Sequence, residues 1–151
     1  MNSIIIGVQP TYSRCKLLGN IIDAKVEELS IEAQVNHLAY NNPEARRIAN
    51  SFGLVPGTEK DVSGKIQIPI NNEKIRIAKN SRTIDPDYDY REYSNSNWTY
   101  ELDEVLRQFE NQARAAGIMM TPVLIINGEL KHQGSLPSSS KINEWLLNLK
   151  K

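Results

Sequence analysis

The sequence predicts a mixed α/β fold, built on a four-stranded sheet with helices on both faces. Residues 3–38 show a strand pattern, a long helical pattern and a second strand pattern in succession. Near the C-terminus, a proline-led apolar strand, an Asn-Gly turn and another strand precede a short amphipathic helix. The first arrangement is typical of a parallel βαβ unit and the second of an antiparallel hairpin. We therefore expect the strand order 2-1-3-4, with the third strand antiparallel to the first.

The N-terminal third accounts for the βαβ unit. Residues 3–8 are apolar and rich in β-branched side chains, which predicts a buried strand. From residue 13 apolar residues recur at helical spacing, and residues 31–38 then alternate between apolar and polar, as in a second strand. His37 falls on the apolar parity of that strand and is expected in the core. A further helix is expected to begin at Pro43, since proline is tolerated at the first helical position.

Residues 54–98 are predicted to form an insertion within a single domain that spans residues 1–151. Alternation in residues 65–78 around a central Asn pair predicts a β-hairpin. Residues 83–97 are acidic and rich in tyrosine, which predicts an irregular surface loop. Its Asp-x-Asp-x-Asp spacing resembles a calcium loop, but Tyr90 and Ser96 stand where that loop needs Gly and Glu, so no metal site is expected. Deletion of this insertion is expected to leave a folded core.

The C-terminal part holds the second half of the sheet. A helical pattern covers residues 102–116 and Gly117 ends it. Pro122 then opens the apolar strand at residues 123–126, where a missing N–H interrupts no interior ladder. Asn127-Gly128 tolerates the positive φ of a tight hairpin turn. His132, on the outer strand of this hairpin, is expected to face solvent.

Composition narrows the classes of function. The 151 residues are 40% hydrophobic, enough for one core, and 18 Lys and Arg balance 18 Asp and Glu. Nucleic acid and anionic membranes are therefore not expected as partners, and no signal peptide or membrane span is expected either. A single cysteine, Cys15, precludes an internal disulfide and favours a reducing compartment, so a cytoplasmic location is expected. With two histidines besides, no structural zinc site is expected.

Residues 117–130 read Gly-Ile-Met-Met-Thr-Pro-Val-Leu-Ile-Ile-Asn-Gly-Glu-Leu, and Gly134, Pro137 and the terminal helix follow. This run resembles the second half of small thioredoxin-like proteins of the redox-active disulfide type. The resemblance implies a thioredoxin-like fold and a cis bond between Thr121 and Pro122, opposite a Cys-x-x-Cys loop. Residues 12–18, Tyr-Ser-Arg-Cys-Lys-Leu-Leu, are similar to the family's Cys-x-x-Cys-Lys-x-Leu. Tyr12 replaces the first, attacking cysteine, and Cys15 keeps the position of the resolving one.

These positions define the candidate site. Cys15 is expected in the first turn of its helix, where the helix dipole and the neighbouring Arg14 and Lys16 favour the thiolate. The thiol is either reactive or a small buried packing residue, and Tyr12 either donates a hydrogen bond to the site or covers the loop. The candidate catalytic residues are Cys15, Tyr12 and Arg14. The candidate substrate-binding residues are Thr11, Ser13, Met120, Thr121 and Pro122.

Two functions from different classes stay open at this point. The first is a thiol redox protein of the thiol-disulfide oxidoreductase class that acts through Cys15 with a resolving thiol from another molecule. Its partner would be a protein or a low-molecular-weight thiol or disulfide. The alternative is a redox-inactive, partner-binding module of thioredoxin fold. A glutathione-dependent transferase is disfavoured because no glutathione site is recognisable. No cofactor is expected, and the sequence does not indicate an oligomeric state.

Overall fold

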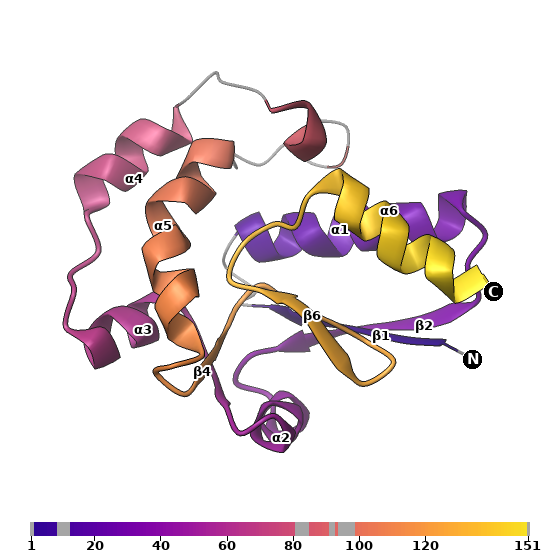
Figure 1. Ribbon diagram of the computed structural model, residues 1–151, viewed down its shortest axis with the longest axis horizontal. Helices are drawn as coiled ribbons and strands as arrows, with labels where there is room; N and C mark the ends of the chain where they lie inside the picture. The colour runs from indigo at the N-terminus through magenta and orange to yellow at the C-terminus, as the bar shows by residue number, and fades with distance from the viewer. Residues whose placement is uncertain (1, 9–12, 81–84, 91–92, 94–98, 151) are drawn as a thin grey trace.

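The computed structural model describes all residues except 1, 9–12, 81–84, 91–92, 94–98 and 151. Its main sheet has the order β2-β1-β5-β6 (Figure 1). The strands are β1 (Asn2–Val8), β2 (Ala33–Ala39), β5 (Val123–Ile126) and β6 (Glu129–Gln133). β1 runs parallel to β2, and β5 runs antiparallel to both β1 and β6. Numbered along the chain, the order is therefore 2-1-5-6 and not the predicted 2-1-3-4.

The difference in numbering comes from two strands that the sequence did not reveal. β3 (Val55–Gly57) and β4 (Ile118–Met120) pair in parallel as a second, two-stranded sheet. Each has only three residues, too few for an alternating pattern to be recognised. β4 ends immediately before Thr121, so this small sheet leads directly into the Thr121–Pro122 bond.

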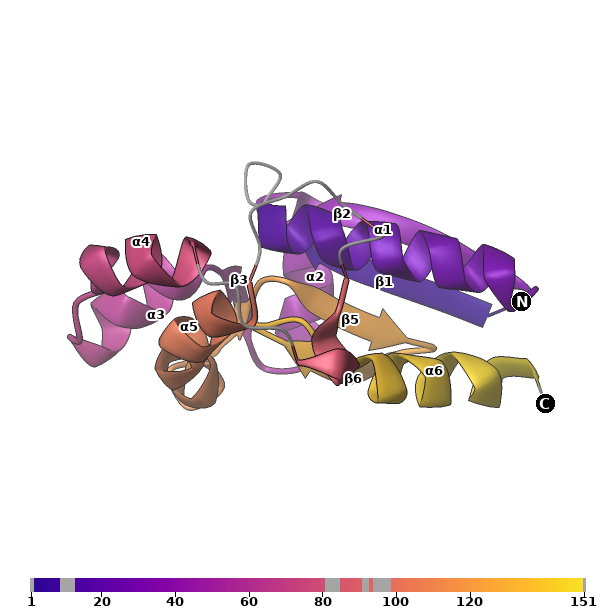
Figure 2. The ribbon, with the colours of Figure 1, turned by 90° about the horizontal axis from the view of Figure 1, so that it is seen from above.

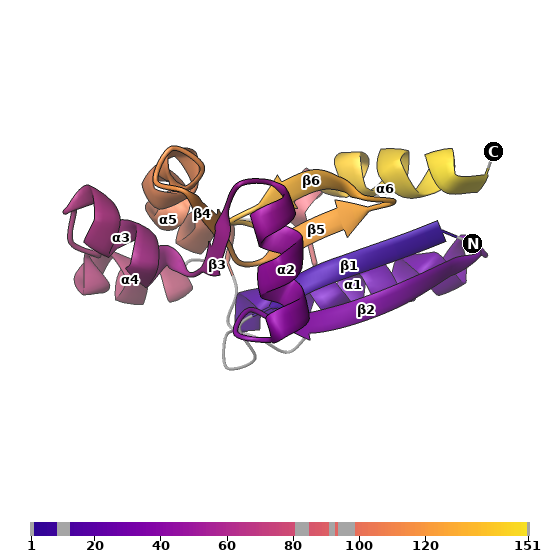
Figure 3. The same ribbon diagram turned by 90° about the horizontal axis from the view of Figure 1, so that it is seen from below.

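Helices cover both faces of the main sheet, as its alternating side chains require. α1 (Ser13–Glu28) and α6 (Ser139–Leu147) lie on one face, and α2 (Pro43–Ser51) lies on the other (Figures 2 and 3). Ile4 and Ile6 of β1 belong to the core under α1 and α6, whereas Ile5 packs with the cluster beneath α2. Successive side chains of a strand point to opposite faces, so β1 contributes to two separate cores.

The predicted hairpin in residues 65–78 is wrong, because this segment is helical. α3 (Glu59–Ile66) begins after a capping box in which the Thr58 backbone N–H donates to Asp61 Oδ2 at 2.8 Å. α4 (Asn72–Lys79) begins after Asn71, whose Oδ1 accepts from the Lys74 backbone N–H at 3.0 Å. Both caps satisfy backbone donors that the first helical turn leaves without partners. Thr58, Asp61 and Asn71 can be recognised in the sequence as capping residues, but the alternation in residues 65–78 favoured a hairpin over helices.

α3 and α4 pack against α5 (Tyr100–Ala113) and β4 in a second hydrophobic cluster (Figure 1). The buried members of this cluster are Val62, Ala78, Leu102, Leu106, Phe109, Ala113, Ile118 and Met120. Most of them lie after residue 98, so residues 54–98 share a core with the chain that follows them. None of the helices in the described part of the chain is long and apolar enough to cross a membrane.

The acidic, tyrosine-rich segment is partly buried, unlike the surface loop that was predicted. It contains a short 3₁₀ helix, η1 (Pro86–Tyr88). Tyr90 is 3% exposed, belongs to the core under α1 and α6, and its hydroxyl donates to the Pro137 carbonyl. Asp87 Oδ1 accepts from the Ser140 backbone N–H at 2.9 Å and from its hydroxyl at 2.7 Å. Within the described ranges, no group of three or more His, Cys, Asp or Glu side chains is arranged so that it could hold a metal ion.

His37 lies at the surface instead of in the core. Its side chain is 40% exposed, and its Nε2 lies 3.2 Å from the Asp23 carboxylate on α1. The ring crosses α1 at Gly19, where a Cβ atom would come within 2.6 Å of it. β2 is an edge strand of the sheet, so alternation alone does not bury its side chains. The His37 ring packs beside Gly19 of α1, because that residue has no side chain to exclude it.

Candidate functional site

The register of the main sheet brings the two halves of the candidate site to one end of the molecule. Gly7, near the end of β1, pairs with Val123, the first residue of β5. The C-terminal end of β1 and the start of β5, which Pro122 precedes, therefore lie at the same end of the sheet. Cys15 is the third residue of α1, so it lies in the first turn of the helix that starts there.

The Thr121–Pro122 peptide bond is cis, the isomer that the family resemblance implies. Three hydrogen bonds hold the turn around it. The Thr121 N–H donates to the Gly57 carbonyl at 3.0 Å, and the Gly134 N–H donates to the Pro122 carbonyl at 2.9 Å. The Met120 N–H donates to Gln133 Oε1 at 3.2 Å. The turn is thus supported by β3 on one side and by the end of β6 on the other.

The candidate substrate-binding residues of this turn are buried. Met120 is fully buried in the cluster around α5, and Thr121 is 2% exposed. Pro122 is buried as well. In this arrangement the Met120 side chain fills the core between β4 and α5, so a docking molecule would reach the backbone of the turn before it reached that side chain.

Cys15 is 1% exposed and is not part of a disulfide. Two physical effects act on its thiol in opposite directions. The N-terminal end of a 16-residue helix without an acidic residue in its first turn favours the thiolate. Burial disfavours any charged form, because the protein interior solvates charge less well than water.

The other candidate residues in the N-terminal half of the chain lie wholly or partly outside the described residues. Tyr12 and Thr11 lie outside the described residues. Ser13 and Arg14 begin α1, but their side chains are outside the described part of the chain. Lys16, the second cation beside Cys15, is exposed. The proposed roles of Tyr12, Arg14, Thr11 and Ser13 therefore stay predictions.

A buried polar cluster between α5 and the end of β6 was not found from the sequence. Its central residue is His132, which was expected to face solvent but whose side chain is only 25% exposed. His132 Nε2 lies 2.9 Å from Ser135 Oγ and 3.8 Å from Glu110 Oε1. Burial lowers the pKa of His132 to about 4, although the nearby Asp103 carboxylate opposes this shift. The imidazole is therefore neutral near neutral pH.

Asp103 and Arg107 complete this cluster. Asp103 is 1% exposed, and its Oδ2 accepts from the Leu136 backbone N–H at 2.8 Å. Arg107 Nη1 lies 3.5 Å from Glu110 Oε2. The spacing of positions 103, 107 and 110 places all three side chains on one face of α5, and this periodicity was available in the sequence. Its partners on β6 could not be read there, because they are brought together only by the fold.

The cluster is a structural support and not a nucleophile relay. A relay needs the histidine to accept from the hydroxyl with one ring nitrogen while a carboxylate binds the other. Here Ser135 and Glu110 both approach Nε2, and Ser135 is 1% exposed. The cluster instead ties α5 to residues 132–136, the segment whose Gly134 N–H holds Pro122.

A mixed sheet with α1 and α6 on one face, α2 on the other and a cis proline entering β5 fits a thioredoxin-like α/β fold. A family model described as "Thioredoxin domain" matches residues 91–147. This match supports a thioredoxin-like protein and, at the level of the family, a thiol redox protein. It covers the Thr121–Pro122 turn and the terminal helix but not Cys15. Comparison with curated proteins and with solved structures found no match.

Proposed function

We propose that this chain is a thiol redox protein that acts through Cys15, with the resolving thiol supplied by another molecule. One observation carries the proposal. The chain's single cysteine stands in the first turn of α1, at the end of the sheet where the cis Thr121–Pro122 bond enters β5. The helix dipole there favours the thiolate, the form that attacks disulfides.

The chemistry of one cysteine fixes the order of events. The Cys15 thiolate attacks one sulfur of an external disulfide, forms a mixed disulfide and releases the other sulfur as a thiolate. Because position 12 is a tyrosine and the chain has no second cysteine, no internal thiol can displace the adduct. A second external thiolate attacks the mixed disulfide and regenerates Cys15. The partner is a protein or a low-molecular-weight thiol or disulfide, in the cytoplasm or another reducing compartment.

A second candidate is a redox-inactive, partner-binding module of thioredoxin fold. It is favoured by the 1% exposure of Cys15, because attack on a bulky disulfide needs an accessible sulfur. In that case Cys15 acts as a small buried packing residue, a common role for cysteines outside disulfides.

Intact-mass measurement after treatment with oxidised glutathione distinguishes the two candidates. The folded wild type should gain one glutathione adduct that persists until a thiol is added, and Cys15→Ser should gain none. The same treatment in strong urea measures the reactivity of the thiol when the chain is unfolded. A Cys15 that reacts only in urea would replace the redox proposal with the binding module. Alkylation at several pH values adds a second readout, since a thiol pKa near the reference of about 8.5 also favours the module.

A further inference from the structure

The two outer strands of the main sheet differ in how they are protected from pairing with other molecules. In the order β2-β1-β5-β6, β2 and β6 each have a neighbouring strand on one side only. The backbone N–H and C=O groups of such an edge can pair with a strand from another molecule. Proteins usually prevent this with charged side chains, proline or a bulge on the edge strand.

The β6 edge has these protective features. Glu129 and Lys131 are two of its five residues, and their charged groups lie 2.6 Å apart. The pairing of β6 with β5 also shifts register between Leu124 and Ile125. A strand that paired with β6 would meet two charged side chains on an irregular edge, so this side of the sheet is poorly suited to association.

The β2 edge has none of these features. Its sequence, Ala-Gln-Val-Asn-His-Leu-Ala, contains no proline, glycine, lysine, arginine, aspartate or glutamate. It pairs with β1 in unbroken register from Ala33 to Ala39. None of these seven residues, all of which the structure describes, is buried, and Figure 3 shows β2 along the outer border of the sheet. The protein therefore leaves its longer and more regular edge open to a further strand.

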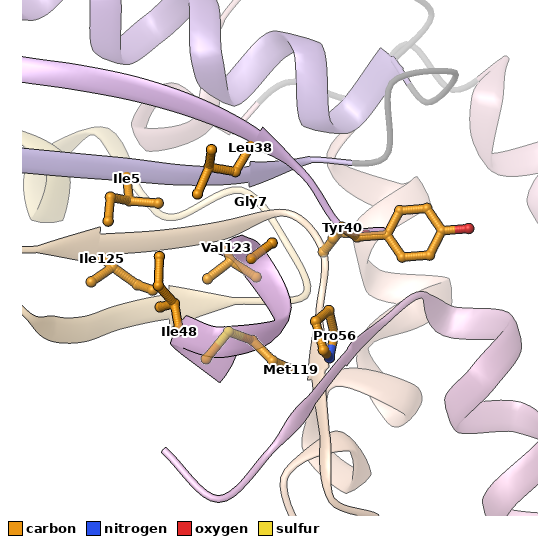
Figure 4. A pocket seen from close by; sticks show the side chains of 11 residues that line it. Ile5, Gly7, Leu38, Tyr40, Ile48, Pro56, Met119, Val123 and Ile125 are labelled. Atoms are coloured by element: carbon orange, nitrogen blue, oxygen red, sulfur yellow. The ribbon is translucent and has the colours of Figure 1, made fainter. Parts of the chain in front are cut away.

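Apolar side chains of β2 are partly exposed on both faces of the sheet. Val35 packs against the core under α1 but is not buried by it. Leu38 lies on the α2 face, where it shares a small apolar space with Ile5 and Ile48 (Figure 4). A strand added beside β2 would remove apolar surface from water on both faces, which favours its addition.

A second copy of the chain is complementary to this edge. Antiparallel pairing centred on Asn36 engages the whole strand, with Val35 opposite the partner's His37 and Leu38 opposite the partner's Gln34. Residues that face each other then project on the same side of the joined sheet. Because β2 carries no Lys, Arg, Asp or Glu, the strand brings no like charges together when it pairs with itself.

The charges of α1 are arranged for the same antiparallel pairing. This helix borders the β2 edge, because Asp23 lies 3.2 Å from the His37 ring. The exposed Lys16 is near the start of α1 and the exposed Glu27 is near its end. A twofold axis at the centre of β2 also reverses α1, so the basic end of one helix lies beside the acidic end of the other. Asp23, nearer the middle, is already bound to His37 of its own chain.

We propose that this chain forms a homodimer in which two β2 strands pair antiparallel about a twofold axis at Asn36 and join the two main sheets into one. The contact is isologous, so it uses the same edge of both copies. Only the two charged β6 edges are then left at the ends of the joined sheet, and association stops at two chains. The dimer involves neither Cys15 nor thiol chemistry, so it is independent of the function proposed above.

Analytical ultracentrifugation under reducing conditions tests the dimer with the full chain. From the low to the high micromolar range the wild type should pass from the mass of one chain to that of two. Cys15→Ser should behave in the same way, which excludes a disulfide-linked dimer. Amide hydrogen exchange then locates the contact without any variant. Exchange in residues 33–39 should slow as the protein concentration rises, whereas exchange in residues 129–133 should not change.

Charge variants at the axis test the register. Asn36→Lys and Asn36→Asp each place like charges opposite one another, so the Kd of either variant alone should rise at least about fivefold. An equimolar mixture of the two variants places opposite charges there and should form dimers at least as well as the wild type. Asn111→Lys makes the same substitution on the exposed surface of α5 and should leave the Kd unchanged.

Several results would overturn the proposal. A wild type that keeps the mass of one chain at high micromolar concentration would exclude the dimer, and species that grow beyond two chains would exclude closure about a twofold axis. Protection from exchange outside residues 33–39 alone would place the contact elsewhere. A folded Asn36→Lys that dimerises like the wild type, or a mixture that stays monomeric, would rule out pairing centred on Asn36.

Discussion

Acid should destabilise this protein through His132 in particular. The pKa of His132 in the folded chain is about 4, below the ordinary value of 6.5, because the ring is buried between α5 and β6. Between these two pKa values the unfolded chain binds a proton that the folded chain does not. The stability that depends on a neutral, buried His132 is therefore fully present above pH 6.5, and it is lost as the pH falls from 6.5 toward 4.

The size of the effect follows from the two pKa values. Each pH unit between them changes the free energy of unfolding by about 1.4 kcal/mol. From pH 7 to pH 5 the loss should come to about 2 kcal/mol, and it should reach about 3 kcal/mol by pH 4.

Urea unfolding of the wild type and of His132→Gln at pH 7 and pH 5 measures the loss. Carboxylates titrate in both proteins. The contribution of His132 is therefore the difference between the two proteins in how much the free energy of unfolding falls from pH 7 to pH 5. His37→Gln, which removes the chain's other imidazole from the exposed surface, is the matched control for the loss of a histidine side chain. The reasoning would be refuted if the free energy of unfolding fell equally from pH 7 to pH 5 in the wild type and in His132→Gln. It would also be refuted if NMR showed that His132 titrates at the ordinary histidine pKa.

Four further predictions concern stability, and urea unfolding measures each of them. Thr121→Val should raise the free energy of unfolding by about 1 kcal/mol, because it removes a buried hydroxyl without a partner; a decrease would show that the hydroxyl is satisfied in solution. Gly134→Ala should lower it by about 1–3 kcal/mol, since Gly134 has φ +90° and a Cβ there would lie 2.7 Å from Glu110 Cγ. Gly64→Ala in α3 should instead be neutral or stabilising, because the added Cβ would meet no side chain or distant backbone atom within 4 Å. Deletion of residues 54–98 should abolish cooperative unfolding, because it removes β3 and exposes the apolar face of α5; a cooperative transition in the deleted chain would restore the separable insertion expected from the sequence.

The main sheet could be predicted because its signals are local. Alternation in residues 3–8, the βαβ spacing and the Asn127-Gly128 turn each depend on neighbouring residues, and positive φ values at both turn positions agree with that interpretation. The segment at 65–78 misled because its isoleucines fit two periods. Ile75 and Ile77 alternate with polar residues, yet Ile75 also stands three residues before Ala78, and these two lie on the side of α4 that packs in the cluster around α5.

The site was less accessible to sequence reasoning, because its properties depend on contacts between distant parts of the chain. The sequence places Cys15 at a helix start but does not show that the fold buries it to 1% exposure. Likewise, His132 alternates as an outer-strand residue should, but α5 covers it and brings Asp103 and Glu110 against it. Burial of His132 is decided by α5, which precedes β6 by two strands along the chain.

The pairing of β3 with β4 also affects how this chain can change in evolution. The two strands run side by side in parallel, and the Val55 N–H donates to the Gly117 carbonyl at 2.9 Å, where the returning chain arrives. Because the two strands are parallel, the chain that leaves β3 after Gly57 has to return to the other end of the pair, beside Val55, before β4 can begin. The connection between them contains α3, α4 and α5, which share one hydrophobic cluster with β4. Selection on these helices therefore also acts on the strand that leads into the cis turn, so this connection cannot vary as freely as a surface loop.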